Sequence, residues 1–453
     1  METELHTQLA IVGAGPAGLA AAEVATRAGR SVVLIDDNPA AGGQVWRRDA
    51  RHGAHPRAAA LIASLRSVRP GCGPSGPAAA GSTGKERSRP EPPIRHLAGT
   101  RVVAAPAPGR LLLEDADGAC LLHYDRLILA SGARERLLPF PGWTLPGVTG
   151  AGGLQALAKS GLDLAGSRVV LAGSGPLLLA AANTLRHAGA EVLLIAEQAP
   201  LRALAGFAAA LPAWPARLAQ AAGLAWRLRG VPYRSDAYVL SARGGERLES
   251  VRLQLGERQC EIACDWLGVG FGLLPNLELA RALGCEVADG RVRVDGWQRT
   301  SLPTIHAAGE ATGVGGLDKA LLEGRIAALA ATGQFVAADA LARKRPRQLR
   351  FAALLARRFA LRPELARLAA ADTVVCRCED VRHSQLAGFA DWREAKLQTR
   401  CGMGPCQGRI CGAACETLYG WPAGSDRPPL QPARLVTLTS AHLPITQPEA
   451  THT

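Results

Sequence analysis

Residues 13–18 read Gly-Ala-Gly-Pro-Ala-Gly, and this segment determines the fold. It follows an apolar strand predicted at 8–12 and begins an Ala-rich helix, after which a second strand is predicted at 31–35. In such a strand–turn–helix, glycine permits the tight turn, the close approach of a pyrophosphate and the packing of helix on strand. An acid ends the second strand, where a carboxylate can bind ribose. We therefore predict a dinucleotide site made by Gly13, Gly15, Pro16, Ala17, Gly18 and Asp36.

A second unit of the same kind begins with a strand at 168–172. The turn that follows, residues 173–178, reads Gly-Ser-Gly-Pro-Leu-Leu, so Leu178 stands where a third glycine normally allows close packing. We expect Leu178 to push its helix outward. The sequence leaves three states of this site open: a nicotinamide nucleotide, a second adenine nucleotide in a non-redox role, or no ligand. The candidate binding residues are Gly173, Gly175 and Glu197.

The composition indicates a globular protein with a large core. Of the 453 residues, 48% are hydrophobic and 20% are charged, which excludes disorder of the whole chain. The net charge is +13, but the basic residues are scattered and accompany no nucleic-acid-binding module, so no nucleic-acid partner is expected. The longest apolar stretches are rich in Gly, and the start lacks a signal peptide. We expect no transmembrane segment and a cytoplasmic location, with peripheral contact at the inner membrane only through partners.

Two later strands end in small residues that resemble a flavin site. One is predicted at 125–130 and the other at 304–308. With the first Gly turn and the loop at 42–44, they resemble the glutathione and thioredoxin reductase-like flavoproteins, in which the matching segments bind FAD. Glu310 replaces the Asp of that fold, and as an alternative it is an ordinary helix-start acid. The resemblance implies FAD contacts from Gly43, Gln44, Ser131, Gly132, Ala133, Gly309, Glu310 and Lys319.

The Cys-rich segment near the end of the chain is the sharpest signal. Cys376-x-Cys378 is followed by Cys401-x4-Cys406, and four thiolates at such spacing suit a 2Fe-2S cluster. Small residues between the last two let backbone N–H groups turn toward the sulfurs. Tetrahedral zinc is the alternative. We interpret Cys411 and Cys415 as buried helix thiols, with a swap of one of them into the ligand set as the alternative. No Cys-x-x-Cys accompanies the flavin segments, which argues against a dithiol–disulfide reductase.

This tail resembles the bacterioferritin-associated-ferredoxin-like 2Fe-2S domain. Joined to a flavin fold that carries Ala-Arg-Glu-Arg at 133–136, it resembles the α (A) subunit family of multi-subunit FAD-dependent amine dehydrogenases, which includes opine oxidase, hydroxyproline dehydrogenase and hydrogen cyanide synthase subunits. The resemblance implies that a partner flavoprotein subunit oxidises an amine or imino acid while this chain relays electrons through FAD and the cluster; a small ferredoxin-like subunit is a further partner. Arg134 and Arg136 are expected to support the strand crossing between the domains.

These observations predict an α/β protein with two Rossmann-like dinucleotide-binding domains and a small C-terminal α-helical 2Fe-2S domain. Two rival functions stay open: a stand-alone NAD(P)H-dependent flavin reductase and a non-catalytic nucleotide-binding scaffold. The expected layout is an FAD-binding domain at 1–155 and 280–335 with a surface insertion at 48–97, a second nucleotide-binding-like domain at 156–279, a basic linker at 336–370, a 2Fe-2S-binding domain at 371–425 and a tail at 426–453.

Overall fold

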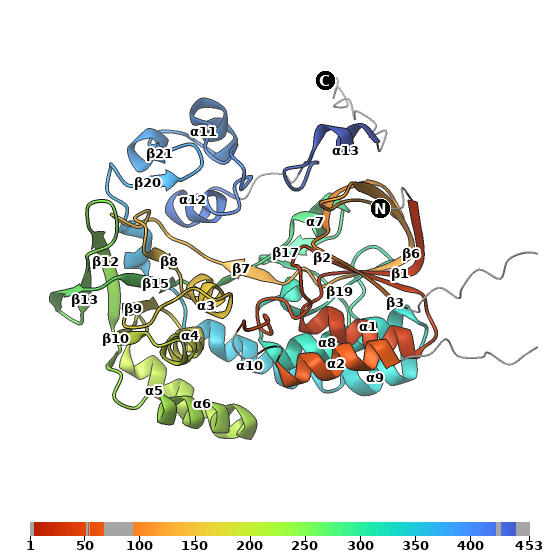
Figure 1. Ribbon diagram of the computed structural model, residues 1–453, viewed down its shortest axis with the longest axis horizontal. Coiled ribbons are helices and arrows are strands. Elements are labelled where there is room, and N and C mark those ends of the chain that lie inside the picture. Colours follow the sequence, from red (N-terminus) through yellow and green to blue (C-terminus); the bar gives the residue numbers. More distant parts are fainter. Residues whose placement is uncertain (1–3, 51–52, 54, 68–93, 423–426, 441–453) are drawn as a thin grey trace, which may run out of the picture.

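The first Gly-rich turn leaves the central strand of a seven-stranded sheet, in a computed structural model that describes residues 4–50, 53, 55–67, 94–422 and 427–440 (Figure 1). The strand order is β3-β2-β1-β6-β5-β4, with β19 beside β6. β1, β2, β3, β6 and β19 pair in parallel, and β4 and β5 pair in antiparallel fashion. The strands are β1 Glu4–Val12, β2 Val32–Asp36, β3 Ile94–Ala98, β4 Arg101–Ala107, β5 Arg110–Glu114, β6 Ala119–Leu129 and β19 Ile305–Ala307.

Helices α1 (Pro16–Arg27) and α8 (Leu317–Ala331) pack on each other below this sheet (Figure 1). Their many Ala residues have short side chains, so the two backbones approach closely. Gly324 marks the closest point, because a Cβ on it would lie 2.1 Å from the carbonyl oxygen of Ala17. Helix α9 (Phe335–Ala342) packs against α8. The chain therefore returns to the first domain after the second, as the sequence predicts.

The surface insertion expected at 48–97 is in part an ordinary piece of the first domain. Helix α2 (Pro56–Ser67) packs on α1 and buries Leu61 and Leu65 in the core. Strand β3 extends the sheet by pairing with β2. The expectation was wrong for these two elements because the polar composition around them hides a short apolar helix face and a strand. Residues 68–93 lie outside the described part of the chain.

The second domain repeats the βαβ unit on an all-parallel sheet. The strand order is β11-β10-β9-β15-β8, and a three-stranded antiparallel sheet, β12-β13-β14, packs beside it. The strands are β8 Val148–Gly150, β9 Arg168–Gly173, β10 Glu191–Glu197, β11 Tyr233–Arg234, β12 Ala237–Arg243, β13 Ser250–Leu255, β14 Arg258–Ala263 and β15 Trp266–Gly270. The helices are α3 Ala151–Lys159, α4 Pro176–His187, α5 Leu201–Ala210 and α6 Pro215–Arg227.

Two short antiparallel strands, β7 (Ala133–Glu135) and β16 (Leu273–Pro275), carry the chain from one domain to the other and back. The crossing therefore lies earlier than the boundary expected at 155, because β8 and α3 already belong to the second domain. The return also precedes the expected residue 280. Helix α7 (Glu278–Ala282) and the pair β17 (Val287–Ala288) and β18 (Arg291–Val292) follow it in the first domain.

The expected basic linker contains a helix, α10 (Arg345–Arg358), that packs against both α5 and α8. A small C-terminal unit follows and lies above the second domain and the crossing strands (Figure 1). Its core is a separate cluster of buried residues that includes thiols of the Cys-rich segment. Its elements are β20 Val374–Cys376, β21 Val381–Arg382, α11 Trp392–Thr399 and α12 Cys411–Tyr419.

The described part of the tail, residues 427–440, docks on the first sheet. Helix α13 (Leu435–Ser440) lies beside β6. Glu114, which is 0% exposed, accepts hydrogen bonds from the backbone N–H of Arg434 and from the Thr437 hydroxyl. It also pairs with Arg101 at 2.9 Å. A buried carboxylate of the first domain thus fixes a segment more than three hundred residues later in the chain.

Candidate functional site

The Gly-rich turn between β1 and α1 is packed too closely for a side chain at two of its glycines. Gly13 has a φ of +105°, and a Cβ on it would lie 2.2 Å from the carbonyl oxygen of Ala130. A Cβ on Gly18 would lie 1.8 Å from the carbonyl oxygen of Gly13. Pro16 begins the helix, so the N–H groups of the following residues are the free donors that a pyrophosphate binds. The turn fits the phosphates of a dinucleotide such as FAD.

Asp36 lies at the carboxyl end of β2, beside this turn. Its side chain is 6% exposed and accepts hydrogen bonds from the backbone N–H of Ala14 and from the backbone and side-chain nitrogens of Asn38. These donors hold the carboxylate at the carboxyl end of the parallel strands, where dinucleotides bind in this class of fold. The position of Asp36 is the one that a ribose-binding acid requires.

The loop at 42–44 meets the first turn in space. Gly43 has a φ of +57°, and a Cβ on it would lie 2.9 Å from the Cα of Gly15. The side-chain oxygen of Gln44 accepts a hydrogen bond from Arg47 at 3.0 Å. The structure thus brings Gly43 against the turn, while the Gln44 amide nitrogen is the end of that side chain that a cofactor could still use.

The segment after β6, residues 131–133, is fastened to the returning strand. The Ser131 hydroxyl donates to the backbone carbonyl of Asn276 at 2.8 Å, and the Asn276 side chain donates back to the Ser131 carbonyl at 2.8 Å. Arg134 donates to the Asn276 side chain at 2.8 Å and pairs with Glu278 at 2.7 Å. The expected role of Arg134 at the domain crossing is therefore confirmed. Gly132, with a φ of +69°, makes the bend between β6 and β7.

Glu310 closes the loop that leads into α8. Its carboxylate accepts hydrogen bonds from the backbone N–H groups of Gly315 and Gly316 at 3.0 and 2.9 Å. Burial raises the pKa of Glu310. Each carboxylate oxygen keeps a further lone pair, which is the acceptor that a ribityl hydroxyl would need.

Lys319 does not offer its ammonium group to a cofactor. Its side chain is 2% exposed, and the Nζ atom donates to the Gly309 carbonyl, the Thr312 hydroxyl and the Glu323 carboxylate at 2.8, 2.8 and 2.6 Å. A lysine has three donors, so these contacts use all of them. Arg345 donates to the other oxygen of Glu323 at 2.8 Å. Lys319 therefore fixes the turn at Gly309, which differs from the cofactor contact that the resemblance implies.

The second turn joins a strand to a helix as the first does, but it has Leu178 where the first has Gly18. Gly270 on β15 leaves the space for this leucine. Leu178 is 0% exposed and packs in the core of the second domain. A Cβ on Gly270 would lie 3.0 Å from a methyl carbon of Leu178, so the missing side chain on β15 provides the space that Leu178 fills. We expected Leu178 to push α4 outward, but the leucine lies in the core. Gly173, with a φ of +153°, also approaches Gly270 closely, its Cβ position lying 2.1 Å from the Gly270 carbonyl oxygen.

Glu197 ends β10 as Asp36 ends β2. Its carboxylate accepts hydrogen bonds from the backbone N–H of Gly175 at 2.7 Å and of Ala199 at 2.9 Å. Its side chain is 1% exposed, and burial raises its pKa. Each Gly turn therefore has an acid at the end of the next strand, but the local geometry differs, because Gly15 has a φ of −74° and Gly175 a φ of +91°.

The C-terminal unit brings together the thiols of its Cys residues. Cys376, Cys401 and Cys411 are buried, and their Sγ atoms all lie within 4.8 Å of one another. Cys411 also contacts Cys406, and Cys406 contacts Cys378. Hydrogen bonds from the thiols of Cys401 and Cys411 lower the pKa of Cys376. With Cys415, which contacts Cys401, six neighbouring thiols are therefore present, two more than the four predicted.

Backbone N–H groups donate to thiols of this site, and one donor, Gly402, lies between Cys401 and Cys406, where the sequence predicts such donors. Gly404 is needed for the approach, because a Cβ on it would lie 2.3 Å from the Cβ of Cys378. Such donors stabilise negative charge on thiolate ligands and are the surroundings that a metal–sulfur site requires. The donors are Gly402 and Glu379 to Cys376, Cys406 to Cys378, and Gly408 and Ile410 to Cys406.

Cys411, for which the sequence favours a buried helix thiol over a ligand, stands among these thiols. Its position at the start of α12 favoured a buried helix thiol, and its side chain is indeed 1% exposed. The available signal was the spacing, because Cys406-x4-Cys411 repeats the spacing of Cys401-x4-Cys406. Because Cys406 belongs to both the Cys401-x4-Cys406 pair and the Cys406-x4-Cys411 pair, the spacing does not show which pair binds a metal.

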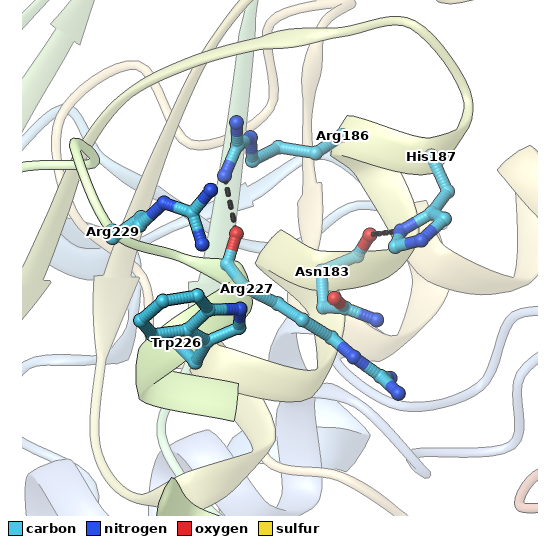
Figure 2. A pocket seen from close by; sticks show the side chains of 6 residues that line it. All are labelled: Asn183, Arg186, His187, Trp226, Arg227 and Arg229. Atoms are coloured by element: carbon cyan, nitrogen blue, oxygen red, sulfur yellow. Dashed lines mark hydrogen bonds between the residues drawn. The ribbon is translucent and has the colours of Figure 1, made fainter. Parts of the chain in front are cut away.

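The described surface also carries a pocket of about 420 Å³ that is separate from these sites (Figure 2). It lies at the C-terminal end of α4, whereas the second Gly turn lies at the N-terminal end of that helix. Figure 2 shows three guanidinium groups around an exposed indole, with Arg186 donating to the carbonyl oxygen of Arg227. The lining residues are Asn183, Arg186, His187, Trp226, Arg227 and Arg229.

No described helix is long and apolar enough to cross a membrane. The family model described as pyridine nucleotide-disulphide oxidoreductase matches residues 7–334. Among solved structures, L-proline dehydrogenase from P. horikoshii is similar in fold, with a TM-score of 0.65 and 17% sequence identity. The matched region covers 96% of this chain and 80% of the dehydrogenase chain. T. acidophilum thioredoxin reductase is also similar in fold, with a TM-score of 0.53 and 20% sequence identity. The matched region covers 73% of this chain and 99% of the reductase chain. Both likenesses concern the fold alone.

Sequence relatives extend over nearly the whole chain. Hydrogen cyanide synthase subunit HcnB of Pseudomonas protegens is 34% identical over 90% of both chains. The A subunit of opine oxidase from Rhizobium meliloti (strain 1021) is 34% identical over 94% of this chain and 96% of its own. This chain belongs to the pyridine nucleotide-disulphide oxidoreductase family and, within it, to the group of flavin-dependent oxidoreductase subunits that contains HcnB and the opine oxidase A subunit.

Proposed function

We propose that this chain is the electron-relaying subunit of a multi-subunit dehydrogenase acting on CH–NH donors, with FAD in its first domain and a 2Fe-2S cluster in its C-terminal unit. When bound, the flavin accepts an electron pair from a donor and the cluster passes electrons on singly. The names of the relatives, which are subunits of hydrogen cyanide synthase and opine oxidase, support an amine or amino-acid-type substrate handled together with a partner flavoprotein subunit.

One observation carries the cluster assignment: several thiols converge on one point, and backbone N–H groups donate to three of them. Structural thiols without a metal need no such donors, because a neutral thiol is a weak acceptor. Zinc also binds thiolates, but a tetrahedral zinc site takes four ligands around one ion. Here contacts join Cys378 to Cys406, Cys406 to Cys411 and Cys411 to Cys376 in series, which favours a cluster over a single ion.

The proposed ligands are Cys376, Cys378, Cys406 and Cys411. Cys411 contacts both Cys376 and Cys406, and Cys406 contacts Cys378, so these four form a continuous series of neighbours. The contacts of Cys401 instead go to Cys376, Cys411 and the deeper Cys415. This arrangement favours Cys411 over Cys401 as the fourth ligand, which revises the set predicted from spacing.

The C-terminal unit is fastened to the flavin domain where the chain crosses between domains. Arg134 donates to the backbone carbonyl of Arg409, which stands between two of the proposed ligands, at 3.2 Å. On the other side, the Trp143 indole N–H donates to the carbonyl oxygen of Val374 at 2.6 Å. The crossing segment therefore holds the proposed cluster in a fixed position relative to the first domain. A fixed position is what electron transfer between two bound centres requires.

Single Cys→Ser variants test the ligand set. Anaerobically purified Cys411→Ser should lose the iron–sulfur absorbance and keep FAD, while Cys401→Ser should keep both. The opposite pattern would restore the set predicted from the sequence. Stoichiometric zinc without acid-labile sulfide would contradict the cluster itself.

The division of labour is tested with the subunits that copurify with this chain. Alone, the FAD-loaded chain should reduce no artificial dye with amino acids, opines or hydroxyproline. Together with its copurified partner it should do so, and the substrate should bleach the flavin absorbance of this chain. Steady turnover by the isolated chain would contradict the proposal and make this chain the dehydrogenase itself.

A further inference from the structure

The second Gly turn is covered by a segment of the chain itself. Gly175, with a φ of +91°, begins α4, and a Cβ on it would lie 3.6 Å from the aromatic ring of Phe359. The hydroxyl of Ser174 donates to the backbone carbonyl of Phe359 at 3.1 Å. The residues that follow α10 therefore lie on the part of the turn where a dinucleotide would place its pyrophosphate.

Gln198 fixes this segment from the opposite side of the turn. It directly follows Glu197 at the end of β10 and is 1% exposed. Its side-chain nitrogen donates to the carbonyl oxygen of Ala360 at 2.8 Å, and its side-chain oxygen accepts from the backbone N–H of Arg362 at 2.9 Å. A buried primary amide that loses its partners costs free energy, so this match stabilises the docked segment. Gln198, next to the acid at the end of β10, thus binds the chain's own backbone.

Both flanks of the segment are anchored as well. The ring of Phe359 packs edge-on against Phe207 of α5, with centroids 5.0 Å apart. Arg362 pairs with Asp236 at 2.6 Å and stacks over the ring of Tyr238 at 4.7 Å. Hydrogen bonds at the centre and ring and ion-pair contacts at both flanks therefore hold the segment against the turn.

The chemistry of this cover opposes nucleotide binding. A pyrophosphate needs free N–H donors and positive charge at the helix start. Here the turn meets an aromatic ring and a backbone carbonyl, and the N–H of Gly175 already donates to Glu197. To bind here, an anion would have to displace the segment. Even then the N–H of Gly175 would not be free, because it donates to Glu197.

We infer that residues 359–362 are the built-in occupant of the second dinucleotide site. The second domain of this chain then binds neither NAD(P)H nor an adenine nucleotide while the segment is docked. Instead, the former nucleotide site serves as the docking point for the connection to the C-terminal unit. This inference does not depend on the metal or the substrate of the proposed function.

The test is nucleotide binding to the full-length, FAD-loaded chain, in which the first site is already filled. Titration calorimetry with NADH, NADPH, ADP and ATP should detect no binding to the unaltered protein. The double variant Gln198→Ala/Phe359→Ala should show saturable ADP binding, at least about tenfold tighter than the detection limit that bounds the unaltered protein, because the docked segment no longer occupies the site. Phe335→Ala, which removes a half-exposed ring elsewhere, is the matched control and should behave as the unaltered chain.

Saturable binding of a nucleotide to the unaltered chain, or no gain in the folded double variant, would overturn the inference. Hydrogen exchange gives a second test without any variant. The backbone amide of Arg362, which donates to Gln198, should be protected, and excess ADP or NADH should leave that protection unchanged. Loss of protection on adding nucleotide would equally overturn the inference.

Discussion

Lys319→Met separates a structural role from a cofactor contact. The ammonium of Lys319 is buried. Its three N–H groups donate to the Gly309 carbonyl, the Thr312 hydroxyl and the carboxylate of Glu323, which is 0% exposed. Removing one partner of a buried pair costs about 3–5 kcal/mol, because the other charge stays buried. Arg345 still pairs with Glu323 at 2.8 Å, so we expect the low end, about 3 kcal/mol. For a domain of this size, that loss lowers the melting temperature by roughly 6–12 °C.

The assay is thermal unfolding of the FAD-free protein, followed by circular dichroism. Without cofactor, a lysine that merely contacted FAD could not affect the melting temperature. FAD affinity, measured by fluorescence titration well below the melting temperature, should be unchanged. Lys344→Met is the matched control, because Lys344 is exposed on the following segment, and it should change stability by less than about 0.5 kcal/mol. An unchanged melting temperature together with loss of FAD binding in Lys319→Met would refute the reasoning.

Three further predictions concern close packing, pH and the tail. Gly324→Ala should destabilise the chain by about 1–3 kcal/mol in urea unfolding, whereas Gly223→Ala on exposed α6, with nothing within 4 Å, should be neutral or slightly stabilising. Burial lowers the pKa of His306 to about 4, so the unfolded chain binds a proton between about pH 6.5 and 4 that the folded chain does not. The free energy of unfolding should fall by about 3 kcal/mol over that acid range, and His306→Leu should abolish this part of the fall. Glu114→Ala should release the tail helix, seen as faster hydrogen exchange at the Arg434 amide, and unchanged exchange would contradict its anchoring role.

The elements that repeat a local pattern could be predicted from the sequence, whereas long-range contacts could not. Both βαβ units follow from strand, Gly turn and helix, since these signals lie close together in the sequence. The accommodation of Leu178 depends on Gly270, which lies on a strand far along the chain. The position of Lys319 suggested a cofactor contact, and only its burial reveals that its donors are used internally. Likewise, nothing in the residues around Ser174 indicates that Phe359 covers them.

The Cys-rich segment shows a different limit. Its composition predicts a metal–sulfur site, because several thiols and small residues lie within a short span, as thiolate ligands of iron–sulfur clusters do. The choice between Cys401 and Cys411 depends on which thiols face one another, and that is set by the start of α12. Spacing alone treats both pairs equally. The contacts among the thiols in the fold therefore support the ligand set that we propose.

The most direct test of the electron-relay proposal is the cofactor content of the full-length chain purified without oxygen. Iron, acid-labile sulfide, zinc and FAD are determined on the same sample, with electron paramagnetic resonance after dithionite reduction. We predict roughly two iron and two sulfide with one FAD per chain, and a paramagnetic signal from the reduced cluster. Zinc in place of iron, with no sulfide and no such signal, would contradict the proposal.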